Sequence, residues 1–501
     1  MINKLLTSIN ENRNKQAFYI NNQYTRYNDF SEIVSGVQQL IIKAEVKNNL
    51  FGIITNDDIE TYATIVALLL LGKCFVPIDS KHPNDRNFHI IGQTELSCIY
   101  CSDKSYLSDE FLSKQSSLLV FTKNLPSSSK GLVHNNYSEE DLAYILFTSG
   151  TTGFPKGVPI TYKNLNSFIN AFLSYGYDFN SSDRFLQIFD LTFDLSIYSY
   201  LFPLIIGASI YTIPKNEIRY SFAYTLLEDH QITCALTVPS FVNFLKPYFE
   251  EIDLPDVKYW LFCGEALQKD IIGDWKKCIP KGKILNVYGP TEATIFCTNY
   301  ECFGLPDMDK DYNGIVCIGK PMPGVDVLIV GEELQEVVLG ATGELCLSGE
   351  QTTKGYVKNP ERNKTSFFTI EKDGKDKTYY RTGDLCFIDK DGDLMYTGRL
   401  DSQVKVQGFR VELSEIENHA RSLNFVSDAV AVAVSDNQSN TLIHLFVTPV
   451  LENKNEEILR HLRSKIPEYM VPKEVHSIKS FPLNVNGKTD RKELSKLLGK
   501  K

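Results

Sequence analysis

A short apolar run, a loop rich in glycine and hydroxyl groups, and an amphipathic stretch together limit most strongly how this chain can fold. Residues 143–147 are apolar, residues 148–157 read Thr-Ser-Gly-Thr-Thr-Gly-Phe-Pro-Lys-Gly, and apolar residues recur at helical spacing over residues 165–173. Thr161 stands before that stretch as a candidate N-cap. The pattern predicts a strand, a loop and a helix in an α/β layered fold.

The loop over residues 148–157 is suited to binding an anion. Its three glycines let backbone N–H groups turn toward phosphate oxygens, its hydroxyl side chains can donate, and Lys156 adds a mobile positive charge. The spacing is not that of a P-loop NTPase, because the lysine follows a proline. A flexible surface loop is the alternative, but the order of glycine, proline and lysine after a strand favours a phosphate site.

The pattern of the chain changes near residue 398, where a strand-like run ends in a tight connector. Beyond it, Ser414 and Glu417 have the spacing of a capping box. The elements expected there are strands over 428–434 and 441–447 and a helix over 456–466. We therefore expect a large α/β domain over residues 1–398, a hinge at 399–402 and a small α+β domain over 403–501. A hairpin exit within one domain is the alternative.

Charge and apolar patterning exclude several classes of protein. The formal net charge of −10 argues against a uniformly basic nucleic-acid-binding face. The longest apolar stretch, residues 63–71, is too short to span a bilayer and indicates a buried helix. Residues 1–16 are polar and lack a signal-peptide core, and the eleven cysteines are mostly isolated. We expect a cytoplasmic protein with no nucleic-acid partner and no membrane span.

Two segments match part of the sequence pattern of a metal site. Cys98 and Cys101 have the spacing of half a zinc site, but no second pair follows, and the segment is strand-like. Residues 389–393, Asp-Lys-Asp-Gly-Asp, have the spacing that begins a calcium loop, but the twelfth position is Leu400 rather than glutamate. We interpret residues 389–393 as a hairpin turn.

The anion loop resembles the phosphate loop of adenylate-forming enzymes, the group of acyl-CoA synthetases, luciferases and peptide-synthetase adenylation domains. Further segments resemble motifs of this family in the family's order: 72–79 (GKCFVPID), 286–292 (NVYGPTE), 380–385 (YRTGDL), 398–417 (GRLDSQVKVQGFRVELSEIE) and 486–491 (NGKTDR). The resemblance covers nearly the whole chain. It implies a large N-terminal domain of layered α/β subdomains and a mobile C-terminal domain that carries the catalytic lysine.

The resemblance also implies the reaction and its cofactors, ATP and Mg²⁺. It assigns catalysis to Lys488, Thr148 and Glu292, with Glu292 also holding Mg²⁺, and it places the pivot at Asp401. The residues implied in ATP binding are Thr148, Ser149, Gly150, Thr151, Thr152, Gly153, Lys156, Gly264, Asn286, Val287, Tyr288, Gly289, Pro290, Thr291, Asp384, Arg399 and Lys488. Asp384 is implied as the acceptor for the ribose hydroxyls, and Lys488 as the cation between the substrate carboxylate and the phosphate.

Two half-reactions follow from the resemblance. A carboxylate first joins the α-phosphorus of ATP and pyrophosphate leaves; a thiol then attacks the adenylate carbonyl after the small domain rotates about Asp401. No carrier segment follows Lys501 in this sequence, so the expected partner is a separate carrier protein with a phosphopantetheine thiol.

Asp194, in the segment Phe-Asp-Leu-Ser, resembles the family aspartate that binds the substrate α-ammonium. A carboxylate in an apolar pocket needs a cation, so Asp194 indicates an amino-acid substrate. Asp190 is a competing candidate four residues earlier, and a capping role for Asp194 is the alternative. The residues implied in substrate binding are Asp194, Leu195, Tyr198, Thr237, Leu261, Cys263, Val287, Ile295, Phe296 and Lys488.

These mostly apolar side chains leave room for a small or modest uncharged amino acid. Residues 262–265 resemble D-alanine:carrier-protein ligases, although Tyr198 is bulkier than expected there, and stand-alone peptide-synthetase enzymes for an L-amino acid are almost as similar. The rival functions are an acyl- or aryl-CoA ligase that uses coenzyme A, a non-catalytic binding module, and a luciferase-like oxidase.

Overall fold

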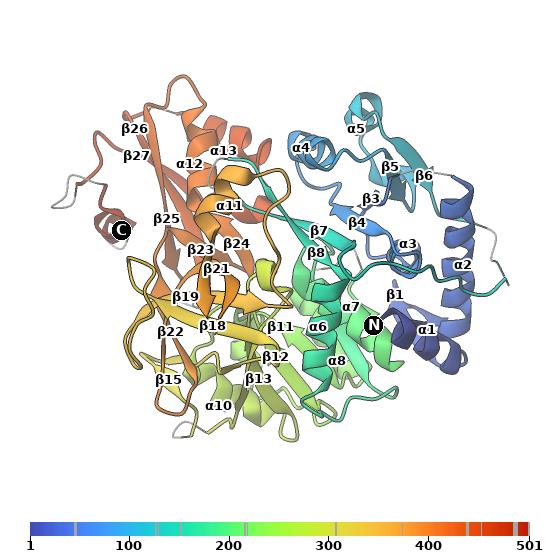
Figure 1. Cartoon of the computed structure of the whole chain (residues 1–501). Helices are drawn as coiled ribbons and strands as arrows, with labels where there is room; N and C mark the ends of the chain where they lie inside the picture. The colour runs from blue at the N-terminus through green and yellow to red at the C-terminus, as the bar shows by residue number, and fades with distance from the viewer. Residues whose placement is uncertain are drawn as a thin grey trace. The chain divides into compact units, whose positions relative to one another are not determined.

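The computed structural model describes residues 1–44, 48–125, 128, 130–150, 153–214, 217, 219–305, 308–372, 374–436, 440–451, 453–483 and 489–498. The chain divides into two compact units (Figure 1). The large unit contains Met1–Asp79, Ile91–Leu146 and Gly157–Leu400, and the small unit contains Ser80–Ile90, Phe147–Lys156 and Asp401–Lys501. The anion loop therefore groups with the C-terminal segment. Rotation about Asp401 stays a prediction.

A nine-stranded sheet forms the centre of the large unit. Its strand order is β17 (Lys320–Pro321), β14 (Thr298–Cys302), β13 (Lys283–Tyr288), β12 (Tyr259–Phe262), β11 (Cys234–Thr237), β9 (Arg184–Gln187), β10 (Ser209–Thr212), β1 (Gln16–Ile20) and β2 (Gln23–Arg26). The strands from β13 to β1 are parallel, and β2, β14 and β17 pair antiparallel at the two edges. The parallel strands are almost wholly buried and apolar, as strands covered on both faces should be.

A second sheet has the order β6 (Leu118–Phe121), β5 (Cys98–Cys101), β3 (Leu50–Ile54), β4 (Cys74–Ile78), β7 (Leu142–Thr148) and β8 (Lys156–Thr161). A third sheet, antiparallel, contains β18 (Val325–Val330), β19 (Gly343–Gly349), β20 (Phe367–Lys372), β21 (Lys375–Ile388) and β22 (Leu394–Arg399). A small hairpin joins β15 (Asp311–Tyr312) to β16 (Ile315–Val316).

The helices of the large unit supply the remaining layers. They are α1 (Ile2–Glu11), α2 (Tyr27–Lys43), α3 (Ile59–Leu70), α5 (Asp109–Lys114), α6 (Tyr162–Leu173), α7 (Asp194–Ile206), α8 (Arg219–Asp229), α9 (Pro239–Leu245), α10 (Lys269–Cys278), α11 (Pro360–Ser366) and the short turns η1 (Lys104–Tyr106), η2 (Lys246–Tyr248) and η3 (Thr291–Ala293). Helix α4 (Asn84–Thr94) begins in the small unit's segment. Among the described helices, none is long and apolar enough to cross a bilayer.

The small unit contains two β-structures and three helices among its described residues. Strands β23 (Gln403–Val406) and β24 (Phe409–Glu412) form a hairpin, and β25 (Asp428–Ser435), β26 (Thr441–Thr448) and β27 (Glu474–Ser477) form a sheet. Helices α12 (Leu413–Arg421), α13 (Asn455–Arg463) and α14 (Arg491–Leu498) and the turn η4 (Glu468–Met470) complete the unit. One face of the sheet packs with α12 and α13, and residues of the other face pack with Leu494 of α14.

The strand, loop and helix predicted around residue 150 are confirmed. Strand β7 ends at Thr148, and Thr161 caps α6 through a reciprocal hydrogen-bond pair with Asn164. The capping box predicted at Ser414 and Glu417 is wrong, because the N-cap of α12 is Glu412, two residues before Ser414, and it makes no side-chain capping bond. Glu417 instead accepts hydrogen bonds from Ala431 N and Arg491.

The Asp-Lys-Asp-Gly-Asp segment is the turn of the β21–β22 hairpin, as predicted, and it encloses a lysine. The ammonium of Lys310 donates to Asp389 at 2.8 Å, Asp391 at 2.8 Å and Asp393 at 2.5 Å. Partial burial lowers the pKa of Lys310, but these three hydrogen bonds outweigh burial, so its pKa is well above the usual value. The lysine thus takes the place that a metal ion has in an acidic loop.

Replacing Lys310 with methionine should therefore destabilise the hairpin. Three carboxylates would face one another without a cation, and we expect a loss of about 1–3 kcal/mol. Millimolar Ca²⁺ should recover part of the loss, because carboxylate oxygens are ligands that calcium prefers. Thermal unfolding with and without CaCl₂ measures both effects. Lys277→Met, which removes an exposed ion pair with Asp274, is the control, and equal melting temperatures of the two variants would contradict this role.

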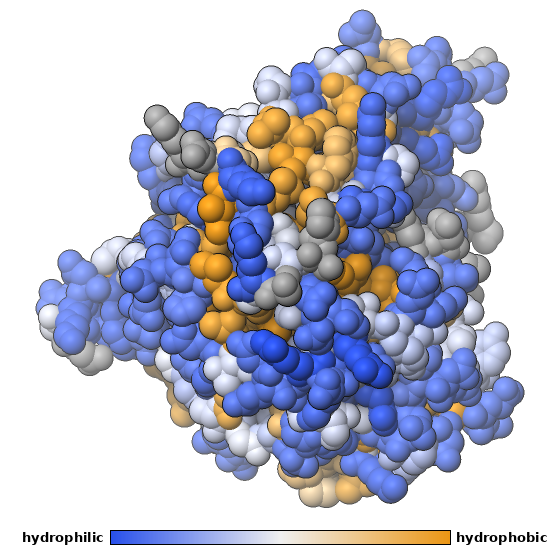
Figure 2. Space-filling view, turned by 90° about the vertical axis from the view of Figure 1, so that its right-hand side faces the viewer, coloured by the Kyte–Doolittle hydropathy of each residue, from blue (hydrophilic) through white to orange (hydrophobic). Residues whose placement is uncertain are grey.

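Apolar side chains also reach the surface at the edge of the six-stranded sheet. Leu118 and Phe121 of β6 are 53% and 38% exposed, and Ile42 of α2 is 49% exposed. Strand β6 is the outermost strand of its sheet in the described part of the chain. Figure 2 shows the face seen from the right of Figure 1, where α2 and β6 lie, with apolar areas among polar ones. The edge of β6 is therefore partly apolar.

Candidate active site

The site in the large unit lies at the carboxyl ends of parallel strands. Strand β11 pairs with β12 so that Thr237 lies opposite Phe262, and β12 pairs with β13 so that Phe262 lies opposite Asn286. Residues that end these strands or directly follow them therefore share one edge of the sheet. In open α/β sheets this edge is where ligands bind.

Asp194 is the first residue of α7 and is only 4% exposed. A helix N-terminus favours a carboxylate, which partly offsets the cost of burying it. The competing candidate, Asp190, is held by Arg219 through two hydrogen bonds of 2.7 and 3.2 Å. Asp190 thus already has a cationic partner in a bidentate ion pair.

The predicted walls of the substrate pocket are buried and mostly apolar. These walls, each at most 2% exposed, are Leu195, Tyr198, Thr237, Leu261, Cys263, Val287, Ile295 and Phe296. Tyr198 and Phe296 lie edge to face at 5.6 Å between ring centroids, and both pack against Phe172. The two large rings are fixed in an aromatic cluster and narrow the space beside α7.

The predicted adenine and ribose residues form one hydrogen-bonded group. Asp384 on β21 lies opposite Arg399 on β22, and it accepts from Arg399 Nη1 at 2.5 Å and from the Tyr288 hydroxyl at 2.5 Å. Burial, and next the charge of Asp384, raise the pKa of Tyr288 well above its usual value, so Tyr288 stays a neutral donor. Asn286 donates to the carbonyl of Cys317 at 2.9 Å, which orients the amide. Gly264, with φ of +87°, lies two residues after the end of β12.

The turn after β13 is strained. Any side chain at Gly289 would collide with the backbone of Phe296, because Cys297 N donates back to Tyr288 O at 2.7 Å. Pro290 caps the short helix η3, which begins with the buried residue Thr291. Thr294 and Ile295 have φ of +56° and +75°, which β-branched residues rarely adopt. Strain of this kind clusters at functional sites.

Gln351 holds this strained turn, a role that the sequence did not reveal. Its side chain is 0% exposed, and its amide nitrogen donates to the carbonyls of Ala293 at 3.0 Å and Phe296 at 2.7 Å. The hydroxyl of Thr294 returns a hydrogen bond to Gln351 O at 2.5 Å. Gln351 is therefore a positioning residue for the turn.

Replacing Gln351 with methionine keeps the volume and removes the donors. We expect a loss of about 2–4 kcal/mol in unfolding free energy, because two or more buried carbonyls lose their partners. The turn should also relax, which would raise the KM for ATP more than it lowers kcat. Urea unfolding and nucleotide titration measure these effects, with the exposed Gln335→Met as control. A wild-type stability and KM in Gln351→Met would refute the positioning role.

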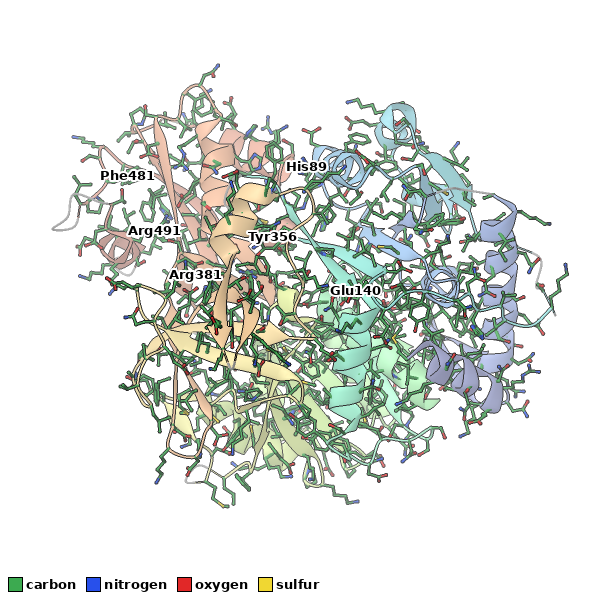
Figure 3. The ribbon with its side chains drawn as sticks, viewed as in Figure 1. His89, Glu140, Tyr356, Arg381, Phe481 and Arg491 are labelled. Atoms are coloured by element: carbon green, nitrogen blue, oxygen red, sulfur yellow. The ribbon has the colours of Figure 1, made fainter. Side chains whose placement is uncertain are left out.

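Glu292, the predicted Mg²⁺ ligand, is 0% exposed and lies in η3. The hydroxyl of Tyr356, labelled in Figure 3, donates to its Oε1 at 2.6 Å. A carboxylate is a hard oxygen donor, the type of ligand that Mg²⁺ prefers. The residues present therefore fit the metal.

The anion loop, in the small unit, already donates to a carboxylate. Gly150 N donates to Glu415 Oε2 at 3.0 Å, and Arg86 donates to Glu415 Oε1 at 2.9 Å. Ser149 donates to Arg410 O at 2.6 Å and accepts from Glu412 N at 3.2 Å. One backbone amide of the loop thus has the Glu415 carboxylate as its acceptor, and phosphate binding by the loop stays a prediction.

One of the other predicted site residues is placed differently from its prediction, and three lie outside the described residues. Lys156 begins β8 and is 3% exposed, so its ammonium is buried rather than at a mobile tip. Thr148 is the last residue of β7, and its hydroxyl is buried. Gly153 has φ of +85°. Asp401 accepts from Gln403 N at 3.2 Å. Thr151, Thr152 and Lys488 lie outside the described residues.

Comparison with known proteins agrees with this arrangement. The family model of AMP-binding enzymes matches residues 5–357, and the model of the AMP-binding enzyme C-terminal domain matches residues 415–488. The chain is 30% identical over 444 residues to the D-alanine–D-alanyl carrier protein ligase of Bacillus licheniformis, covering 86% of each protein. It is 30% identical over 478 residues to bacitracin synthase 3 of the same species, covering 94% of this chain but only 7% of that synthase.

A solved structure extends the likeness to the fold. The adenylation domain AlmE of Vibrio cholerae, in complex with glycyl-adenosine-5'-phosphate, superposes with a TM-score of 0.87 at 25% identity, covering 100% of this chain and 97% of that one. The chain belongs to the AMP-binding enzyme family. The proteins that it resembles include a peptide synthetase, a carrier-protein ligase and an adenylation domain.

Proposed function

We propose that this enzyme activates an amino acid with ATP, forming aminoacyl-AMP and pyrophosphate, and then transfers the aminoacyl group to the phosphopantetheine thiol of a separate carrier protein. The observation that carries the proposal is Asp194, a buried carboxylate at the start of α7 beside apolar walls. A buried carboxylate of this kind is balanced best by a substrate ammonium. Asp190 is less suited to that role because Arg219 already neutralises it.

The first half-reaction brings a carboxylate and a triphosphate together, so its main demands are charge neutralisation and in-line placement. Tyr288, Asp384 and Arg399 would position the nucleoside, and the loop over residues 148–157 would receive the departing pyrophosphate. Lys488 would place its ammonium between the carboxylate and the α-phosphate. Glu292 would hold Mg²⁺, which would draw negative charge from the phosphate oxygens.

The loop geometry adds a condition to this mechanism. Gly150 N can donate to a phosphate oxygen only after it releases the Glu415 carboxylate, because one N–H serves one strong acceptor. Arg86 would then keep Glu415 as its partner. Nucleotide binding would therefore require the loop and α12 to separate.

The substrate that fits best is D-alanine or another small or modest uncharged amino acid. The packing of Tyr198 against Phe296 limits the side-chain space. Two similar proteins point the same way, since one is a D-alanine–D-alanyl carrier protein ligase and the other is an adenylation domain in complex with glycyl-adenosine-5'-phosphate. An acyl- or aryl-CoA ligase is the alternative; it would leave Asp194 without a partner from the substrate.

ATP–pyrophosphate exchange tests the proposal. We expect exchange to depend on one or a few small D- or L-amino acids and to be absent with the matching acids that lack the amino group. Purified carrier protein, bearing phosphopantetheine, should then gain the mass of that aminoacyl group, whereas coenzyme A should not. Exchange with plain aliphatic or aromatic acids alone would overturn the proposal in favour of the CoA-ligase alternative.

A further inference from the structure

Two histidines and a glutamate meet on the three-stranded sheet of the small unit, and none of them has been assigned a role above. His444 lies on β26, and Glu474 and His476 lie on β27. The two strands are neighbours in Figure 1. They are parallel, with His444 directly opposite Glu474. Residues two apart on one strand share a face, so all three side chains project from the same side of the sheet.

That side is the one that α14 covers. Ile443, Leu445 and Val447 belong to the core shared with α12 and α13, whereas Phe446 belongs to the cluster with Leu494 of α14. By alternation, His444 projects with Phe446, and the ring of His476 stacks on Phe446 at 4.9 Å. The cluster therefore has an apolar wall, which holds both imidazole rings in place.

The ligand atoms are spaced as a metal ion requires. His444 Nδ1 and His476 Nε2 are 3.1 Å apart, and Glu474 Oε2 is 3.6 Å from His476 Nε2. Two nitrogens bound to one tetrahedral Zn²⁺ are about 3.3 Å apart, given zinc–nitrogen bonds of about 2.0–2.1 Å. One possible ligand atom from each of His444, Glu474 and His476 can be chosen so that all three atoms lie within 4.8 Å of one another.

Access and charge also suit a metal. His444 is 9% exposed, whereas the carboxylate of Glu474 is half exposed, so an ion can enter from solvent on the glutamate side. Glu474 adds the negative charge of a carboxylate next to the two imidazoles, which bind metals in their neutral form. The positive charge of Lys473, which acts on His444, opposes cation binding.

We propose that His444, Glu474 and His476 form a binding site for a divalent transition-metal ion, with Zn²⁺ as the best-matched ion. Two imidazoles and one carboxylate are a ligand set that zinc commonly takes, with a fourth position left for water. Imidazole ligands disfavour Mg²⁺ and Ca²⁺, so this site differs from the Mg²⁺ position proposed at Glu292. The metal would tie β26 to β27.

Zinc titration of the full chain, first freed of metal with a chelator that is then removed, tests the proposal. We expect isothermal titration calorimetry with ZnCl₂ to give one saturable equivalent. His444→Gln and His476→Gln should each weaken binding at least tenfold, and Glu474→Gln should weaken it less. His461→Gln, on α13 of the same unit, is the matched control and should bind as the wild type does.

A spectroscopic measurement on the wild type protects the test against variants that do not fold. Co²⁺ in place of zinc should give the intense visible absorption of a four-coordinate nitrogen–oxygen site, and one equivalent of Zn²⁺ should abolish it. The proposal is overturned if Zn²⁺ shows no saturable equivalent, if folded His444→Gln and His476→Gln bind it as tightly as the wild type, or if Co²⁺ stays six-coordinate.

Discussion

Replacing Lys488 with alanine is expected to lower ATP–pyrophosphate exchange about 10²–10³-fold. The size follows from the loss of one preorganised charge at the point where negative charge concentrates in the transition state. Lys488 follows an Asn-Gly pair at residues 486–487, which suits a lysine at a turn. The rate of exchange at saturating ATP and amino acid is the quantity to measure.

The second half-reaction separates a chemical role of Lys488 from general damage. Transfer from chemically prepared aminoacyl-AMP to the carrier thiol should change only a few-fold in Lys488→Ala, because the lysine is expected to act in adenylation alone. Lys492→Ala, at an exposed position on α14, is the control and should keep both rates. An undiminished exchange rate in Lys488→Ala would count heavily against the mechanism.

Replacing Asp194 with asparagine should lower kcat/KM for the amino acid about 10²–10³-fold. The substitution keeps the shape but removes the charge, so the substrate ammonium would be buried without a counter-ion, at a cost of about 3–5 kcal/mol. The KM for ATP should change little, because Asp384 and Arg399 remain. Exchange kinetics over a range of amino-acid concentrations give both parameters.

The Asp190→Asn variant tests which of the two carboxylates, Asp190 or Asp194, binds the substrate ammonium. The partner of Asp190 is Arg219, so this variant should lose some stability but keep most of its amino-acid activation. If Asp190→Asn abolished activation while Asp194→Asn did not, the ammonium would be assigned to the wrong carboxylate. Circular dichroism of both variants shows whether each is folded.

Sequence patterns predicted those elements that are determined by residues close together in the chain. The strand ending at Thr148 and the helix capped by Thr161 were read from apolar spacing and one hydroxyl, and both are present. The hairpin turn over residues 389–393 was also predicted from its own residues. The capping box at Ser414 failed because α12 follows β24 at once, so the helix begins at Leu413 without a side-chain cap.

Contacts between distant segments were not predictable in this way. Gln351 supports a turn more than fifty residues earlier in the chain, and nothing around it in sequence indicates which carbonyls it meets. Lys310 lies 79 residues before Asp389. The residues of the acidic turn therefore gave no sign of which cation neutralises them. The positive φ angles of Thr294 and Ile295 run against their residue types.

The anion loop was predicted for its chemistry but not for its partner. Glycines and hydroxyl groups indicated that the loop would donate to an anion, and Gly150 N does so. The acceptor is Glu415, held in turn by Arg86, and these residues lie 265 and 64 positions away from Gly150 in the sequence. The Gly150 amide is therefore occupied by a carboxylate in this structure, and its role toward phosphate stays a prediction.

A crystal structure of the enzyme with a non-hydrolysable sulfamoyl analogue of its aminoacyl-adenylate tests the central claim most directly. We predict that the analogue's ammonium lies within hydrogen-bond distance of Asp194 and its ribose hydroxyls within reach of Asp384. Binding of the analogue elsewhere, or with its ammonium remote from Asp194, would contradict the assignment of this site to amino-acid adenylation.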